Sequence, residues 1–367
     1  MSDDAHAARY HRIQLALAVV TTALGLGYLV AVLATGAARD LASASARLVA
    51  AWWWQVGVVT IALGAVHGLL ALPLTWIRGY ALPRRFGLLH QSFPSWLGDR
   101  LKGAVLGGVL ALAGVEIIYG LLGITRWWWL VAAAVFFVGY VLMAVVVPIW
   151  VLPLFYRLRP LESGELRERV CALADRVGIP LVGVWIADQS RKSRTANAAV
   201  VGLGRTRRIL LFDTLVNSFA PAEIESVLAH ELGHHVHGDV RRGLLVQGLL
   251  TLVTFAIADV ALGAGVRLWQ LEGRGDPAGV PWLALVVAVL GFVTMPLANG
   301  FSRFVERQAD DFALATTADR EAFVGAMERL AALNLAERRP HPIKEFWLAS
   351  HPSIERRIAR ARSRALV

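Results

Sequence analysis

The chain has 367 residues, of which 56% are hydrophobic and 17% are charged, and its formal net charge is +10 at pH 7. A soluble domain of this length typically has closer to half apolar and a quarter charged residues, so the composition argues against a soluble globular protein. The basic surplus alone would suit nucleic-acid binding, but its distribution along the chain favours another explanation. We therefore expect no nucleic-acid partner.

Six apolar blocks indicate membrane spans, because crossing the bilayer core takes about 20 helical residues. In chain order the blocks are Ile13–Ala34, Val56–Ile77, Ala104–Ile124, Trp127–Trp150, Gly243–Val266 and Pro281–Leu297. The last block is marginal, and any single block is compatible with a buried core helix. Six in one chain favour a mainly α-helical polytopic membrane protein. The fourth block follows the third after a very short turn, so the choice between six and seven spans stays open.

The basic residues fall mostly on one side of these blocks. With the N-terminus inside, two Lys or Arg residues precede the first block, five follow the second, thirteen lie between the fourth and fifth, and twelve follow the last. These are 32 of the 37. This positive-inside pattern places both termini and both large polar segments in the cytoplasm. The surplus then reflects topology and attraction to anionic lipid headgroups, so membrane lipids are expected partners.

Cys171 is the only cysteine, so no internal disulfide can form, which fits a reducing cytoplasmic face. It lies near an apolar helix face, and we expect it in the core. At the N-terminus, Arg9 and Arg12 precede the first apolar block. The small-residue run 42–44 allows a cleaved signal peptide, but the block is longer than a signal sequence requires, which favours an uncleaved first helix.

Two polar segments divide the chain into four parts. We expect a membrane domain of four spans (1–155), a polar segment (156–242), a transmembrane hairpin (243–300) and a helical C-terminal segment (301–367) with a break at Arg339–Pro342. In the first polar segment, the pattern predicts a helix that ends at Gly178, and strands at Leu181–Ala187, Asn197–Leu203 and Arg208–Phe212. A second helix begins near Pro221, a residue that suits a first helical turn.

That second helix carries a His-Glu-Leu-Gly-His run. His230 and His234 are four residues apart, so both imidazoles lie on one face and can reach one metal ion. Glu231 follows the first histidine and can accept a proton from a water at the metal's open position. Incidental histidines on a helix are the alternative. His235 and His237 are rotated off this face, and we expect them at the surface or behind the ligands.

A catalytic zinc site needs a third protein ligand. The extended motif with a third histidine fails, because residue 240 is Val240. Downstream of the last apolar block, Glu306 and Asp310 are four residues apart on one helical face. Glu306 can ligate, and Asp310 can accept a hydrogen bond from a ligating imidazole. The alternative is a charged helix near the membrane boundary in which Arg303 and Arg307 pair with these acids.

These motifs resemble the M48 family of membrane zinc metalloproteases, most closely the Ste24-type CAAX prenyl proteases. The resemblance rests on residues 229–234, on Ser302-Arg303 with Glu306 and Asp310, and on the late His351-Pro352 with Arg357-Ile358. The strand region 193–215 also resembles the family, and Arg85-Phe86-Gly87 resembles it more weakly. From about residue 75 onward the motifs occur in the family's order.

The resemblance implies a fold and a set of roles. The fold is a helical membrane protein with a cytoplasmic zincin-like α+β metalloprotease domain. One Zn²⁺ per chain would be bound by His230, His234 and Glu306, with Glu231 as general base. Asp310 and Arg357 would support the ligands, Asn197 would bind the substrate backbone as an added strand, and His351 would contact the substrate or the oxyanion. Two departures are the span count, seven in the eukaryotic enzymes, and Ala199, where those enzymes have an aromatic residue.

The resemblance leaves the substrate open. A Ste24-like endopeptidase acting on CAAX-type or related membrane-associated peptides, lipidated or not, is our first hypothesis. An HtpX-like quality-control protease is the second, and a non-catalytic lipid- or peptide-binding scaffold is the third. The Ala- and Arg-rich composition indicates a bacterial source, and hence the inner (plasma) membrane. The oligomeric state stays open, as do the roles of the intramembrane residues His67, Glu116 and Asp259.

Overall fold

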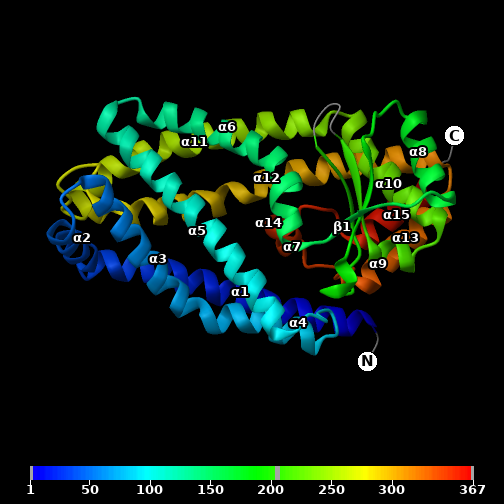
Figure 1. Cartoon of the computed structure of the whole chain (residues 1–367), viewed down its shortest axis with the longest axis horizontal. Coiled ribbons are helices and arrows are strands. Elements are labelled where there is room, and N and C mark those ends of the chain that lie inside the picture. The colour runs from blue at the N-terminus through cyan, green and yellow to red at the C-terminus, as the bar shows by residue number, and fades with distance from the viewer. Residues whose placement is uncertain (1–2, 203–206, 365–367) are drawn as a thin grey trace.

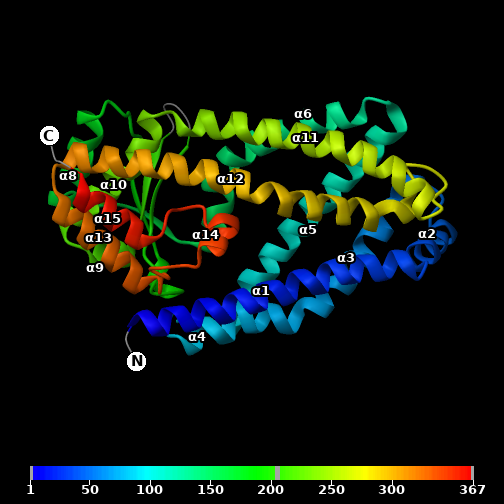
Figure 2. The ribbon, with the colours of Figure 1, turned by 180° about the vertical axis from the view of Figure 1, so that it is seen from behind.

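The computed structural model describes residues 3–202 and 207–364. A bundle of long helices occupies one end of the molecule, and a compact α/β unit occupies the other (Figures 1 and 2). Six helical segments in this part of the chain are long and apolar enough to cross a membrane, and each contains or overlaps one predicted block. The six-span prediction is thus confirmed at the level of length and composition.

The long helices of the bundle have the following bounds. They are α1 (Asp3–Ala34), α3 (Trp52–Trp76), α5 (Phe93–Ile124), α6 (Trp128–Val146), α11 (Asp239–Leu268) and α12 (Val280–Thr317). The short α2 (Ala37–Leu48) lies between α1 and α3. Two spans continue through a π-helical turn into a short helix, α3 into α4 (Leu82–Arg85) and α6 into α7 (Leu152–Phe155). Pro83 and Pro148 lie at these turns, where their missing N–H groups disrupt regular α-helical bonding.

The inside of the bundle is apolar, with the fully buried side chains of Trp128, Tyr119 and Leu262 among its largest. Asp259 accepts hydrogen bonds from Trp128 Nε1 at 2.6 Å and from Arg274 at 2.5 Å, so it serves helix packing. Glu116 lines an apolar cavity of about 500 Å³ with Trp52. The His67 ring packs against Tyr28.

The α/β unit is built on a four-stranded sheet in the order β1-β2-β4-β3. Its strands are β1 (Leu158–Pro160), β2 (Gly183–Ala187), β3 (Ala198–Val201) and β4 (Arg208–Phe212). β2 and β4 are parallel, whereas β1 and β3 pair antiparallel with their neighbours, which leaves β3 at an edge. The three predicted strands are therefore present, with Leu203 outside the described residues. The three-residue β1 was not predicted.

Helices pack with this sheet around one core, to which α12 also contributes. They are α8 (Glu165–Arg176), α9 (Asp213–Ser218), α10 (Pro221–Val236), α13 (Arg320–Leu333) and α15 (Ile354–Ser363). The short α14 (Pro342–Leu348) packs against α12 instead. The core includes the fully buried Leu173, Ile209, Leu228 and Phe323. The predicted stop of the first helix is present, because Gly178 has a φ of +69°, which favours glycine after a helix end.

The structure places Cys171 differently from the prediction. Cys171 is exposed on α8 and not in the core, because the buried face of this helix runs through Val170, Leu173 and Ala174 and leaves Cys171 turned away.

The four-part division of the chain remains a proposal about organisation. α12 continues through the proposed boundary at residue 300 and so joins the last span to the C-terminal segment.

The hairpin of α11 and α12 depends on a close approach at Gly265. A methyl group there would overlap Trp282 Nε1, which donates a hydrogen bond to the Ala261 carbonyl at 2.9 Å. We therefore expect Gly265→Ala to displace the indole, break that bond and lower the free energy of unfolding by about 1–3 kcal/mol. Thermal or denaturant unfolding in detergent measures this.

The matched control is Gly291→Ala, also on the hairpin, where the added methyl would meet no atom of the described residues within 4 Å. Its expected effect is neutral or slightly stabilising, since alanine is the better helix former. Equal stability losses in the two variants would contradict the close-packing interpretation.

Candidate metal centre

Helices α10 and α12 pack against each other and carry the metal-site candidates. α10 begins at Pro221 as predicted, and Glu223 accepts a hydrogen bond from the Ala220 amide at 2.8 Å, which caps the helix start. In its last turns, a Cβ at Gly233 would lie 3.0 Å from the Phe312 ring on α12. Glycine at this position therefore lets the two helices approach closely enough for their side chains to share one site.

The structure brings His230, His234 and Glu306 together. One ligand atom from each lies within 4.8 Å of the others. His230 Nε2 is 3.3 Å from Glu306 Oε2, and His234 Nε2 is 3.5 Å from Glu306 Oε1. His230 and Glu306 are both buried. They lie side by side although a transmembrane hairpin separates them in the sequence. The expected third ligand is thus beside the two histidines.

The donor set fits a zinc ion. Two imidazole nitrogens and a carboxylate are a common set of protein ligands for catalytic zinc, with further positions left for water or substrate. Glu306 Oε2 is buried among imidazole nitrogens, with His351 Nδ1 at 2.8 Å and His230 Nε2 at 3.3 Å, and a buried carboxylate is costly unless a cation satisfies its charge. The site therefore favours a bound metal over an incidental cluster of charges.

Each histidine is held from behind by an acid. His230 Nδ1 is 2.8 Å from Asp310, which also accepts hydrogen bonds from Arg357 at 2.5 and 2.9 Å. His234 Nδ1 is 2.9 Å from Asp239. These contacts fix the Nδ1–H tautomer and direct each Nε2 toward the metal position. Asp310 thus contacts the candidate ligand His230, and Arg357 contacts Asp310.

Asp239 is a residue that the sequence reasoning missed. It lies five residues after His234, in the first turn of α11, and the chain reverses before it at Gly238, whose φ is +68°. The available signal was an acid directly after a glycine at a helix junction. The contact depends on how α11 leaves α10, and helical spacing alone does not specify that angle.

The charge state of the centre reflects burial and these acids. Burial on its own would lower the pKa of His230, but hydrogen bonds to Asp310 and Glu306 outweigh it and raise the pKa to about 9. Burial raises the pKa of Glu231, and the nearby His230 and His234 oppose the shift. Without metal, the His230 ring is therefore protonated on both nitrogens and positively charged at neutral pH.

Zinc must displace that proton, because only a neutral imidazole ligates. A folded-state pKa of about 9 means that zinc affinity should rise by about tenfold per pH unit between pH 6 and 8 for this one proton. Competition with a chromophoric chelator measures the slope. Asp310→Asn removes a group that raises the pKa of His230, so a shallower slope is expected for that variant, and an unchanged slope would contradict the assignment.

Two other expected residues lie near the centre. His351 Nδ1 is 2.8 Å from Glu306 Oε2, with its side chain 60% exposed. Arg303 holds the segment before it by donating hydrogen bonds to the carbonyls of Glu345 at 2.9 Å and Ala349 at 2.5 Å, and it does not pair with Glu306. Asn197 is exposed immediately before β3, and one cavity of about 510 Å³ is lined by both Asn197 and His351.

His235, in the last turn of α10, and His237, at its C-cap, contact neighbouring elements. His235 Nε2 is 3.3 Å from the Val200 carbonyl of β3, and the His237 ring packs edge-on against Phe312. His235 therefore links the metal helix to the edge strand. Neither residue belongs to the group of three candidate ligands in the described part of the chain.

One helix carries two candidate metal-ligand histidines and a glutamate suited to catalysis, and a long apolar helix adds a carboxylate. This combination is typical of a membrane metallopeptidase. Comparison with known proteins agrees. The family model described as peptidase family M48 matches residues 160–365, and the model described as the CAAX prenyl protease N-terminal region, with five membrane helices, matches residues 2–157. The chain belongs to peptidase family M48, and it is a metalloendopeptidase of the Ste24 type.

Individual relatives support this assignment. The uncharacterized metalloprotease YhfN of Bacillus subtilis is 33% identical over 313 residues, which are 83% of this chain and 72% of that protein. CAAX prenyl protease 1 of Saccharomyces cerevisiae is 34% identical over 203 residues, 53% of this chain and 44% of that protein. The crystal structure of S. mikatae Ste24p has the same fold, with a TM-score of 0.87 at 22% identity over 98% of this chain and 89% of that one.

The N-terminal region differs from its family description in one respect. Within the described part of residues 2–157, four segments qualify as candidate spans, whereas the family model is described with five membrane helices. α2 has 12 residues and is too short to cross a bilayer core. The sequence expectation of four spans before the metal helix therefore agrees with the structure.

Glu306 is the sharpest test of the metal centre. We expect Glu306→Ala to lower zinc affinity by about tenfold or more, because one of three candidate protein ligands is lost and only the two imidazoles remain. Zinc content after dialysis against a chelator, measured by mass spectrometry, gives the answer. Asp311→Ala, on the same helix but paired with Arg360 at the surface, should retain zinc.

Proposed function

We propose that this chain is a zinc-dependent endopeptidase that hydrolyses peptide bonds at the membrane surface. One observation carries the proposal: the candidate ligands of α10 and α12, with Glu231 beside them, share a site next to the open edge strand β3. Such a site offers a metal position, a base and a place for an extended peptide. A non-catalytic scaffold would not require these groups together.

The mechanism assigns each step to a side chain. His230, His234 and Glu306 would hold a zinc ion, whose chemical contribution would be Lewis acidity toward the scissile carbonyl and the attacking water. Glu231 accepts the proton of that water, and its raised pKa, caused by burial, makes it a stronger base than an exposed carboxylate. Glu231 then returns the proton to the leaving amine. His351, exposed at the centre, donates a hydrogen bond to the developing oxyanion.

The substrate backbone would add to the sheet at β3. An extended peptide gains main-chain hydrogen bonds when it pairs with an unpaired strand edge. Asn197 precedes this strand, and its side-chain oxygen accepts a hydrogen bond from the Ala198 amide at 2.9 Å. The Asn334 side chain bonds both the amide and the carbonyl of Ala196, at 2.9 and 3.1 Å, which fixes the approach to the strand.

CAAX-type or related membrane-associated peptides are our proposed substrates. The support is the named activity of the yeast relative, CAAX prenyl protease 1, together with the N-terminal family match. The positive-inside charge pattern favours a cytoplasmic orientation of the site, and the similarity to a Bacillus subtilis protein supports the plasma membrane of a bacterium. Ala199 removes an aromatic contact expected beside Asn197, so lipid preference is the property to measure.

Glu231→Gln tests the mechanism. We expect the variant to keep its zinc, because Glu231 is not a ligand, and to lose at least about 100-fold in the rate of peptide hydrolysis, because the proton acceptor is gone. Zinc content and cleavage of a fluorogenic peptide are measured on the same preparation. Hydrolysis at the wild-type rate with metal bound would refute the role of Glu231.

The substrate class is tested with three peptides: farnesylated, unprenylated and derived from an unfolded membrane protein. We expect cleavage of membrane-associated peptides, with the farnesylated form preferred through a lower KM because its lipid holds it at the bilayer surface. Glu231→Gln is the blank for each reaction. A preference for the unfolded substrate would instead favour a quality-control protease.

A further inference from the structure

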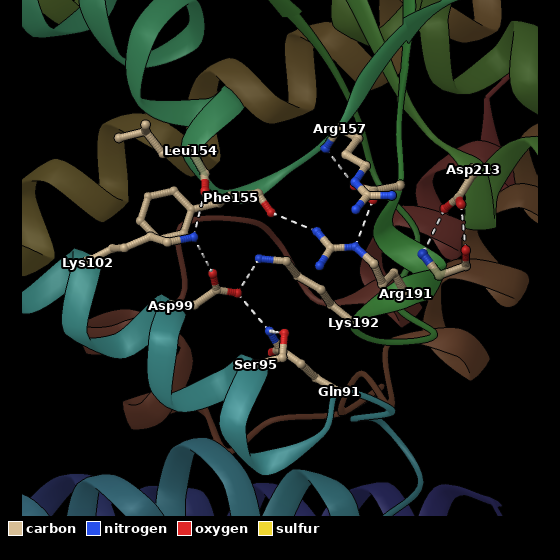
Figure 3. A network of polar contacts seen from close by, with 12 residues as sticks. Gln91, Ser95, Asp99, Lys102, Leu154, Phe155, Arg157, Arg191, Lys192 and Asp213 are labelled. Carbon is tan, nitrogen blue, oxygen red and sulfur yellow. Dashed lines mark hydrogen bonds and ion pairs between the residues drawn. The ribbon is translucent and has the colours of Figure 1, made fainter.

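A second polar cavity lies where the bundle meets the α/β unit, and Figure 3 shows the polar contacts around it. Its volume is about 370 Å³. Three parts of the chain form its walls: the first turns of α5 with Asp99 and Lys102, the end of the fourth span with Leu154, and the α/β unit with Arg157 and Arg191. None of these residues belongs to the candidate metal site.

The walls of this cavity carry more positive than negative charge. Lys102 Nζ is 3.4 Å from Asp99 and donates a hydrogen bond to the Leu154 carbonyl at 3.1 Å. Arg191 pairs with Asp188 at 2.8 Å. The Arg157 guanidinium makes no hydrogen bond or ion pair with the residues that the structure describes; only its backbone amide donates to Asp188. Arg157 is also exposed, so its charge is available to a ligand.

A fourth cation, Lys192, makes the contacts that join the α/β unit to α5. Lys192 is buried, lies 2.6 Å from Asp99 Oδ2, and its ammonium group stands over the Tyr156 ring at 4.6 Å. Gln91 also donates to Asp99, at 2.7 Å. These contacts join the α/β unit to α5 without help from Lys102 or Arg157. The contact between the α/β unit and α5 therefore does not depend on the exposed cations Lys102 and Arg157.

The cavity lies at the depth of the lipid headgroups. Lys102 stands two residues before the apolar block Ala104–Ile124, and the fourth span ends at Phe155. Large apolar side chains are exposed nearby: Leu154 in the cavity wall is 54% accessible, and Leu101, the chain neighbour of Lys102, is 58% accessible. Exposed cations next to exposed apolar surface at a span end are the arrangement that an anionic phospholipid satisfies, because its phosphate meets the cations and its chains cover the apolar surface.

We propose that this cavity binds the phosphate headgroup of an anionic phospholipid through Lys102 and Arg157, with the acyl chains against Leu101 and Leu154. A free phosphate shares the headgroup's chemistry, but it would leave the adjacent apolar surface uncovered. The lipid would sit against Arg191, whose loop leads to β3. The proposal is independent of the peptidase mechanism, and a failure of either leaves the other standing.

The test uses the full-length protein in detergent with equal amounts of phosphatidylglycerol and phosphatidylcholine, and native mass spectrometry counts the retained lipid. We expect retention of phosphatidylglycerol, reduced about tenfold or more in Lys102→Gln/Arg157→Gln because two cations are lost. The control, Arg100→Gln/Arg167→Gln, removes the same charge from exposed positions on α5 and α8 outside the cavity wall, and it should bind like the wild type.

Three results would overturn the proposal. They are equal retention of the two lipids by the wild type, equal loss in the two double variants, and binding of inorganic phosphate without preference for phosphatidylglycerol. Zinc content and thermal stability verify that each variant is folded. If the cavity variant fails this check, Arg157→Gln alone provides the test, since its side chain has no partner among the described residues to lose.

Discussion

The packing of α10 against α12 is the contact on which the metal centre depends. α10 carries two imidazoles and a glutamate, and the third candidate ligand, Glu306, joins them only because α12 lies alongside. Gly233 permits the close approach to Phe312, and the Asp310–Arg357 pair then ties α12 and α15 to the back of His230. Buried charges of this kind are stable only when each has its partner, so the elements of the site must assemble together.

The bundle and the metal centre are continuous through the same helices. α12 leaves the apolar block at Leu297 and reaches Glu306 nine residues later, about 14 Å along the axis at the rise of an α-helix. α11 begins with Asp239 and enters its apolar block at Gly243, about 6 Å away. The metal centre therefore lies close to the membrane boundary at a distance set by rigid helices.

Much of this architecture was predictable from the sequence because its causes are local. Bilayer thickness fixes the length of an apolar block, so the spans stand out. Helical spacing puts His230 and His234 on one face whatever surrounds them. The partner of His234 was not predictable, because Asp239 reaches it only through the turn at Gly238. The exposure of Cys171 was mispredicted, since its neighbours decide which face of α8 is buried. Tertiary packing determines both, and spacing along the chain does not record it.

The edge strand β3 is also positioned from the membrane side. The segment after α4 pairs with the loop before β3: the His90 amide donates to the Lys192 carbonyl at 2.8 Å, and the Arg194 amide donates to the Leu88 carbonyl at 3.1 Å. Lys192 in turn pairs with Asp99 at the start of α5. An exposed strand edge binds a peptide best when it is already rigid, because less conformational entropy is lost on binding. The membrane helices therefore act on both halves of the candidate site: α12 carries the candidate ligand Glu306, and α5 holds the loop that leads to the strand.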